Sequence, residues 1–124
     1  MAEPNLIQPV ESPVICVPYL EPSHYWDYNR ETGVADKIEG RRPSYYWYKD
    51  ETDTRRQQLT LELEEQRRDM VMVNKLRRDV KRWRDSQWEG ATNVTKDLLR
   101  HWTRPDRQRR FFFCQIEAVE TLIF

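Results

Sequence analysis

The sequence has few of the residues that build disulfide scaffolds, metal sites or phosphate loops. Its 124 residues include two cysteines, two histidines and three glycines. Cys16 and Cys114 stand far apart and without C-x-x-C spacing, which argues against a disulfide framework or a zinc site and favours a reducing, cytoplasmic environment. The glycines, at positions 33, 40 and 90, are too widely spaced to form a Gly-rich phosphate loop. No arrangement of histidines, cysteines and carboxylates predicts a catalytic or metal-binding residue.

Long apolar runs are also missing. No run exceeds about five residues, far below the ~20 that a membrane-spanning helix needs, so no membrane partner is expected. The N-terminus has no early Lys or Arg and is interrupted by prolines, which is not typical of a signal peptide. Charged residues make up 34% of the chain and the mean hydropathy is −0.97, so we expect a thin core. Five Trp, six Tyr and four Phe offset this, because each ring buries a large area.

The formal net charge of zero conceals two oppositely charged blocks. Residues 1–66 carry seven Lys and Arg against thirteen Asp and Glu, a net charge of −6. Residues 67–110 carry fourteen against six, a net charge of +8, and Glu117 and Glu120 restore the balance. A basic block of this size is typical of a nucleic-acid contact, and an acidic neighbouring domain is the alternative partner.

Three regions follow one another along the chain. Residues 1–20 are spaced by prolines and predict an extended arm. Residues 21–50 predict a β-hairpin with strands at 24–28 and 34–39 around a turn at 29–33, and then an aromatic segment at 45–48 that is an edge strand or a docked segment. Residues 51–124 predict a helical segment. The expected fold is α+β and mainly α, in which the arm and hairpin precede a long amphipathic helix and two shorter helices.

The long helix is predicted from about residue 53 to residue 88. Apolar residues recur there at spacings of three, four or seven, with room for one break near residues 66–69. This stripe comprises Leu59, Leu63, Met70, Val73, Leu76, Val80 and Trp83. Gly90 suits the C-cap of this helix, and Asn93 suits the N-cap of a short helix at 94–102. A last helix carries Gln115.

Two groups of cationic side chains are candidate DNA contacts. The first lies opposite the apolar stripe, on the outer face of the long helix, and comprises Arg67, Lys75, Arg78, Lys81 and Arg82. The second is the pair Arg41 and Arg42. Both groups suit the phosphates of double-stranded DNA rather than its base edges. The alternatives are an ordinary solvated helix face and, for the arginine pair, ion pairs with acids such as Glu39 or Asp36.

Several blocks of the sequence resemble, in order, the N-terminal region of type III restriction enzyme subunits, which are large DEAD/DEAH-like proteins of helicase superfamily 2. The blocks are EPSHYWDY at 21–28, TG at 32–33, IEGRRPS at 38–44, VNKLRRDVKRWR at 73–84, GAT at 90–92, LLRHW at 98–102 and QIEAV at 115–119. In that family a glutamine after an aromatic or basic stretch reads the adenine of ATP, and a P-loop further downstream holds the phosphates. The resemblance implies that Gln115 contacts adenine and that Phe112 or Phe113 supplies a stacking surface.

The resemblance also implies a larger enzyme around this chain. Its cofactor would be ATP with Mg²⁺, and its partners would be double-stranded DNA, the rest of the helicase polypeptide and a modification subunit. Because the sequence stops in an apolar helix before any P-loop, we expect an N-terminal accessory region of an ATP-dependent DNA restriction enzyme, inactive on its own. A self-standing DNA-binding or regulatory module is the alternative. Without the resemblance, Gln115 has a structural interpretation, because half-buried glutamines at a helix start usually bond the backbone.

Overall fold

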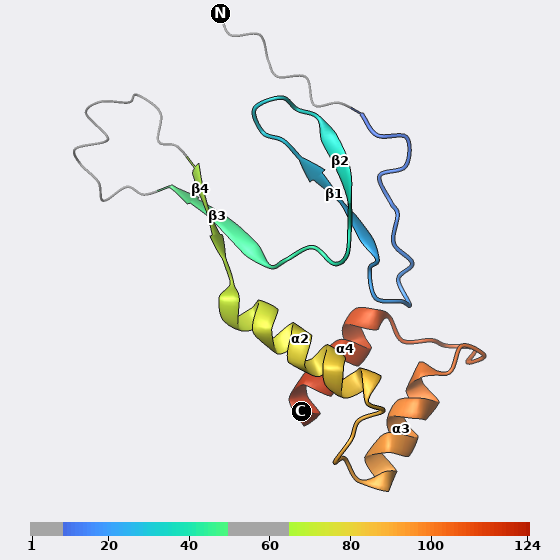
Figure 1. Ribbon diagram of the computed structural model, residues 1–124. Helices are drawn as coiled ribbons and strands as arrows, with labels where there is room; N and C mark the ends of the chain where they lie inside the picture. The colour runs from blue at the N-terminus through green and yellow to red at the C-terminus, as the bar shows by residue number, and fades with distance from the viewer. Residues whose placement is uncertain (1–8, 50–64) are drawn as a thin grey trace, which may run out of the picture.

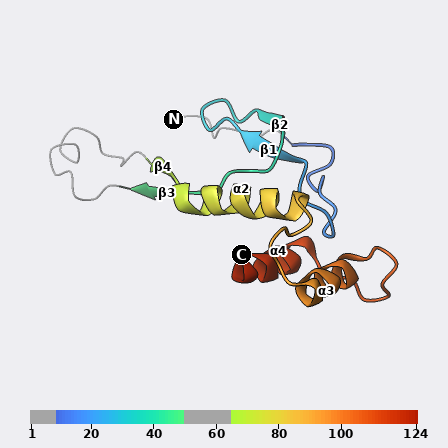
Figure 2. The ribbon, with the colours of Figure 1, turned by 60° about the horizontal axis from the view of Figure 1, so that its bottom comes forward.

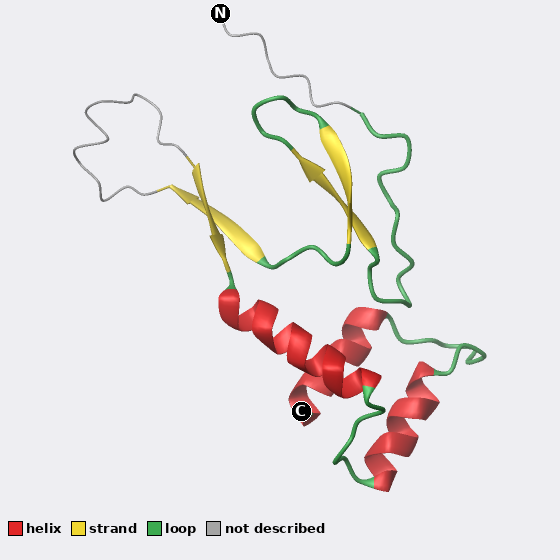
Figure 3. Ribbon diagram, in the orientation of Figure 1, coloured by secondary structure: helices red, strands yellow, loops and turns green. Residues whose placement is uncertain are grey.

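The computed structural model describes residues 9–49 and 65–124, which form two β-hairpins and three helices (Figures 1 and 3). The strands are β1 (His24–Tyr28), β2 (Ala35–Glu39), β3 (Tyr45–Lys49) and β4 (Glu65–Asp69). The helices are α2 (Val71–Asp85), α3 (Asn93–Thr103) and α4 (Phe113–Ile123). The fold is α+β with helices predominating, as the sequence predicts. No helix in the described part of the chain is both long and apolar enough to span a bilayer.

The first hairpin, β1 with β2, is the one that the sequence predicts. The two strands pair antiparallel over their full length. Asn29 organises the turn, because its side-chain oxygen accepts hydrogen bonds from the backbone N–H groups of Glu31 and Thr32 at 2.9 and 3.1 Å. Gly33 closes the turn with a φ of +69°, a conformation that other residues rarely adopt.

The second hairpin replaces part of the predicted long helix. β4 pairs antiparallel with β3, so residues 65–69 are extended and the helix begins only at Val71. The aromatic side chains of β3 face the arginines of β4 across this ladder, with Trp47 opposite Arg67. Such cross-strand contacts stabilise a strand and here outweigh the local helical periodicity. The predicted helical residues 53–64 lie outside the described residues.

α2 also ends earlier than predicted. Its last residue is Asp85, and Gln87 and Trp88 then adopt φ angles of 58° and 57°, in the left-handed region. These angles end the helix, so Gly90 is a loop residue and not the C-cap. Trp88 turns back and is buried beneath the helices.

α3 and α4 lie close to their predicted positions. The N-cap of α3 is Thr92 rather than Asn93, and its hydroxyl accepts a hydrogen bond from the backbone N–H of Thr95 at 3.3 Å. α4 begins at Phe113, whose backbone N–H donates to the carbonyl of Pro18 in the N-terminal arm at 2.8 Å. The arm therefore docks on the start of α4.

The core lies where the three helices meet. α4 packs against both α2 and α3, and Figure 2 shows these two helices on one side of α2 and the first hairpin on the other. The buried apolar residues of the described chain are Val80, Trp88, Leu99 and Ile116. Glu120 is buried beside them and is fully inaccessible. A core this small leaves much of the tertiary structure to polar contacts.

Candidate nucleic-acid interface

A groove runs between α2 and the segment that joins the two hairpins. Its volume is about 680 Å³. Five cationic side chains line it, namely Arg41, Arg42, Arg77, Arg78 and Lys81, against two carboxylates, Glu21 and Asp69. The lining therefore carries a net charge of +3. Four of the seven predicted DNA contacts, namely Arg41, Arg42, Arg78 and Lys81, meet in this groove.

The segment on the hairpin side of the groove is held at both ends. Gly40 has a φ of +102°, and its backbone N–H donates to the carbonyl of Ser23 at 2.6 Å. At the other end, the side chain of Asn74 on α2 bonds both backbone groups of Ser44. Its oxygen accepts from the Ser44 N–H at 2.7 Å, and its amide donates to the Ser44 carbonyl at 3.0 Å. These contacts fix the two arginines between Gly40 and Ser44 against α2.

Arg41 is neutralised within the chain. Its guanidinium group donates two hydrogen bonds to Glu117 of α4, at 2.5 and 2.7 Å, and this bidentate contact raises the pKa of Arg41. Burial alone would raise the pKa of Glu117. The bond from Arg41, with the charges of Arg41, Arg84 and Arg77, outweighs burial, so the pKa of Glu117 is lowered. An ion pair was the predicted alternative for Arg41, but its partner is Glu117 and not Glu39 or Asp36.

Lys81 is also paired within the chain. Its ammonium group lies 3.2 Å from Glu21 and 3.4 Å from Asp85. The hydrogen bond to Glu21 is the main reason why the pKa of Lys81 is raised. The acidic N-terminal half of the chain therefore neutralises part of the basic helix.

A buried ion cluster lies directly behind these pairs. The Nε of Arg84 donates to both carboxylate oxygens of Glu120, at 3.0 and 2.9 Å, and the indole N–H of Trp88 donates to the same carboxylate at 3.1 Å. The two terminal nitrogens of Arg84 lie 3.5 Å from Glu117 and 3.9 Å from Glu21. This cluster joins α2, α4 and the arm, and so supports the wall of the groove.

Three cations of the groove pair with no carboxylate of the described residues. Arg77 and Arg78 form no ion pair there, and Arg42 donates to the backbone carbonyl of Trp26 and lies 5.4 Å from the ring of Tyr25. Arg77 was absent from the prediction, because the helical wheel selected only residues opposite the apolar stripe. Arg77 lines the groove because the segment between the hairpins crosses α2 beside it, and no pattern in the sequence predicts that crossing.

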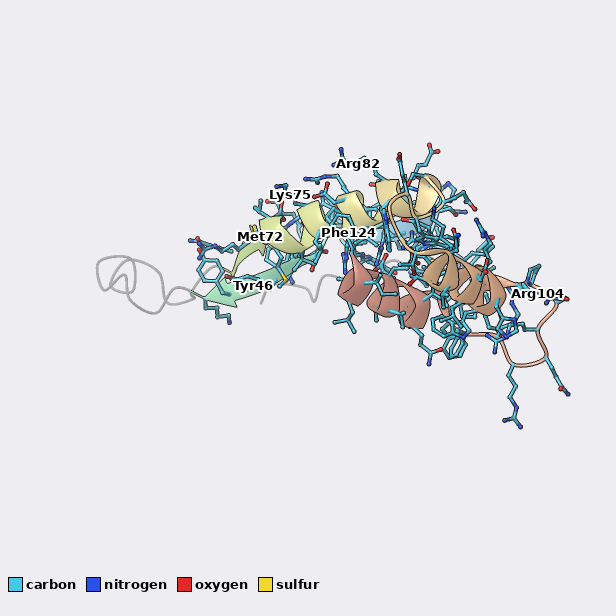
Figure 4. All side chains as sticks on the ribbon, turned by 90° about the horizontal axis from the view of Figure 1, so that it is seen from below. Tyr46, Met72, Lys75, Arg82, Arg104 and Phe124 are labelled. Atoms are coloured by element: carbon cyan, nitrogen blue, oxygen red, sulfur yellow. The ribbon has the colours of Figure 1, made fainter. Side chains whose placement is uncertain are left out.

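Arg67 and Arg82 do not line the groove. Arg67 is not on the predicted helix face, whereas Arg82 lies one turn after Arg78 on α2, as predicted. Arg67 belongs to β4, where its Nε bonds Asp69 at 3.0 Å. Arg82 is on α2 and pairs with Asp79. Figure 4 shows Arg82 and Lys75 projecting on the side of α2 that faces away from α4.

Gln115 caps its own helix. Its side-chain oxygen accepts a hydrogen bond from the backbone N–H of Phe112 at 2.9 Å, as in the structural interpretation. Gln115 also lines a small cavity of about 140 Å³, together with Trp102, Phe111, Ile116 and Val119. The aromatic rings beside Gln115 are thus those of Trp102 and Phe111.

The two predicted stacking residues have other contacts. Phe112 packs on Tyr19 of the arm, with ring centroids 5.7 Å apart. The ring of Phe113 lies below the guanidinium groups of Arg84 and Arg41, at 4.9 and 5.5 Å. Neither residue lines the cavity of Gln115, and a stacking surface for adenine at Phe112 or Phe113 stays a prediction.

Comparisons with other proteins leave the family open. No protein-family model, no curated protein and no solved structure matches the chain. Within the described residues, no group of three or more His, Cys, Asp and Glu side chains could hold a metal ion. The geometry therefore defines a basic groove and nothing more specific.

Proposed function

We propose that this chain binds the phosphate backbone of double-stranded DNA through the basic groove, without sequence preference. The observation that supports this is the convergence of Arg42, Arg77 and Arg78, which have no carboxylate partner among the described residues. Guanidinium groups suit this task because their planar N–H donors match the oxygens of a phosphate. The expected contact is with phosphates alone, because side chains that bind phosphates carry no sequence information.

The internally paired cations have a supporting role in this proposal. Arg41 and Lys81 are engaged by Glu117 and Glu21, so a phosphate would have to compete with a carboxylate for each of them. The number of phosphate contacts is therefore closer to three than to five. Since each contact contributes about 0.9 to the slope of log K against log salt, the expected slope is roughly −2.7.

A salt titration of duplex binding tests this proposal. The variant replaces Arg77 and Arg78 by Gln, which keeps helix propensity and removes two charges. The expected slope falls to roughly −0.9, since one contact remains. The matched control replaces Arg100 and Arg104 by Gln, two exposed arginines of α3 and its C-cap that pair with Asp97 and Asp106. Figure 4 places Arg104 far from α2.

Equal slopes for the wild type and the groove variant would contradict the proposal. A loss of slope in the control variant would show that the binding is a general effect of net charge. Circular dichroism of both variants checks that the helices are intact.

We further propose that the DNA contact serves as an accessory region of an ATP-dependent restriction enzyme or helicase. The support is the resemblance to type III restriction subunits, in which ATP and Mg²⁺ would be bound by the complete enzyme. Gln115 would then read adenine with its amide nitrogen, because its oxygen is engaged by Phe112. In a complete enzyme, Gln115→Ala should reduce the preference for ATP over GTP, and an unchanged preference would leave Gln115 with its capping role alone. A self-standing DNA-binding module is the alternative, and it predicts the same salt titration.

A further inference from the structure

A second hollow lies between the two hairpins and is lined by alternating aromatic and cationic side chains. Its volume is about 590 Å³. The rings are those of Tyr28, Tyr45 and Trp47, and the cations are Arg30, Arg42 and Arg67, with Asp27 and Glu31 at the same surface. Arg42 also lines the basic groove, so the two sites share this side chain.

Two rings of this hollow, those of Tyr28 and Trp47, are exposed. Tyr45 and Trp47 lie on the same face of β3, edge to face, with their centroids 6.2 Å apart. Trp47 keeps 40% of its surface exposed, although a tryptophan in a thin-cored protein would be expected to contribute to the core. Trp47 is therefore not a core residue.

A guanidinium group lies over each of the two rings on β3 that line the hollow. The guanidinium of Arg30 lies 3.7 Å from the centroid of Trp47, and that of Arg67 lies 4.1 Å from the centroid of Tyr45. Guanidinium planes stack on nucleobases as aromatic rings do, and their N–H edges bind phosphates. A hollow with aromatic faces and cationic edges therefore matches the two parts of a single-stranded nucleotide.

We propose that this hollow binds unpaired DNA bases by stacking, so that the chain recognises the junction between a duplex and a single strand. The inference rests on the proposed function, because the duplex would lie in the basic groove and its unpaired strand would continue past Arg42. Arg67 at this hollow bonds Asp69, whereas Arg42 pairs with no carboxylate of the described residues and is the side chain that would meet a phosphate. The stacking surface belongs to β3, and β4 holds it through the ladder that pairs Trp47 with Arg67.

The experiment compares three DNA probes: a blunt duplex, the same duplex with an overhang of about six thymidines, and the same duplex with an abasic overhang of equal length. The two overhangs carry the same phosphates, so their difference reports only the bases. The thymidine overhang is expected to bind at least roughly fivefold more tightly than the abasic one, the gain for one stacked base. Trp47→Ala should remove this difference and leave the affinity for the abasic probe unchanged.

A matched control is available on the same strand. Tyr46 is 45% exposed, and its ring packs with Tyr48 on the opposite face of β3. Tyr46→Ala removes a ring of similar exposure and should keep the preference for thymidine. If Trp47→Ala unfolds the hairpin, Trp47→Leu provides an apolar substitute without a stacking plane.

The outcomes separate this inference from the proposed function. Equal binding of the thymidine and abasic overhangs, with normal binding of the blunt duplex, overturns the stacking site alone. Binding of the thymidine overhang that depends on Trp47, without any binding of the blunt duplex, overturns the duplex groove alone. A similar loss of thymidine preference in the Tyr46 and Trp47 variants would mean that the hairpin as a whole, and not the hollow, makes the contact, which also overturns the stacking site.

Discussion

The buried pair of Arg84 and Glu120 is expected to show strong energetic coupling. Glu120 is fully buried, and 19% of the Arg84 side chain is exposed, so solvent screens this pair little. Removing one partner of a buried ion pair leaves an uncompensated charge, which typically costs about 3–5 kcal/mol. Removing both charges avoids that penalty, so a double-mutant cycle isolates the coupling.

The substitutions Arg84→Met and Glu120→Gln suit this cycle. Methionine keeps the length of the arginine side chain, and glutamine keeps an oxygen for the indole N–H of Trp88, now 3.1 Å from Glu120. Arg84→Met should cost about 3–5 kcal/mol, because Glu120 then keeps only the bond from Trp88. Glu120→Gln should cost less, because Arg84 still lies 3.5 Å from Glu117. The double variant should be more stable than Arg84→Met alone.

Urea denaturation followed by tryptophan fluorescence and far-ultraviolet circular dichroism measures these free energies of unfolding. A small domain has about 5–15 kcal/mol of stability in total, so the single arginine variant should lose a large part of it. The coupling between the two sites should be about 2 kcal/mol or more. Costs that add within roughly 0.5 kcal/mol would refute the reasoning, because independent sites add in that way.

The acid sensitivity of the fold should depend on Glu117. The pKa of Glu117 is lowered in the folded state, so its carboxylate stabilises the fold above the unfolded pKa, and this stability is lost as the pH falls through the folded pKa. Glu117→Gln should therefore reduce the acid-induced loss of stability. Urea titrations at several acidic pH values would measure this loss. Thr92→Ala should destabilise the protein by about 1 kcal/mol, because α3 loses its N-cap bond, whereas Thr92→Asp should not, because aspartate also caps. Thermal melts measure this difference, and equal melting temperatures of the two variants would mean that the cap bond is unimportant. Gln115→Glu keeps an acceptor for the Phe112 N–H and should melt like the wild type, while Gln115→Ala should melt lower.

Local chemistry was sufficient to predict the first hairpin and the last two helices. Asn29 and Gly33 specify a turn through their own side-chain bonding and backbone freedom, whatever lies around them. Residues 93–103 form a helix close to its predicted bounds, and residues 113–123 form the predicted helix that carries Gln115, because each has an apolar face in a short uninterrupted segment. The sequence also singled out Arg41, Arg42, Arg78 and Lys81, which the fold brings together in one groove.

The second hairpin was not predictable in the same way. β4 contains no residue of the apolar stripe, and its strand conformation depends on pairing with β3, which lies earlier in the chain. The position of Arg77 in the groove was not predictable either, because it depends on the hydrogen bonds between Asn74 of α2 and Ser44. Contacts of this kind leave no periodic pattern in the sequence.

The sequence by itself determined that the chain has an acidic half, a basic block and few apolar residues for a core. Only the tertiary structure decided which of these charges neutralise one another. Arg41 meets Glu117 from 76 positions away, and Lys81 meets Glu21 from 60 positions away. Their pairing depends on the distances between side chains in the folded chain, because the interaction between two charges weakens with distance and is screened by salt. Among the described residues, Arg42, Arg77 and Arg78 pair with no carboxylate, and the proposed function assigns these three cations to a partner.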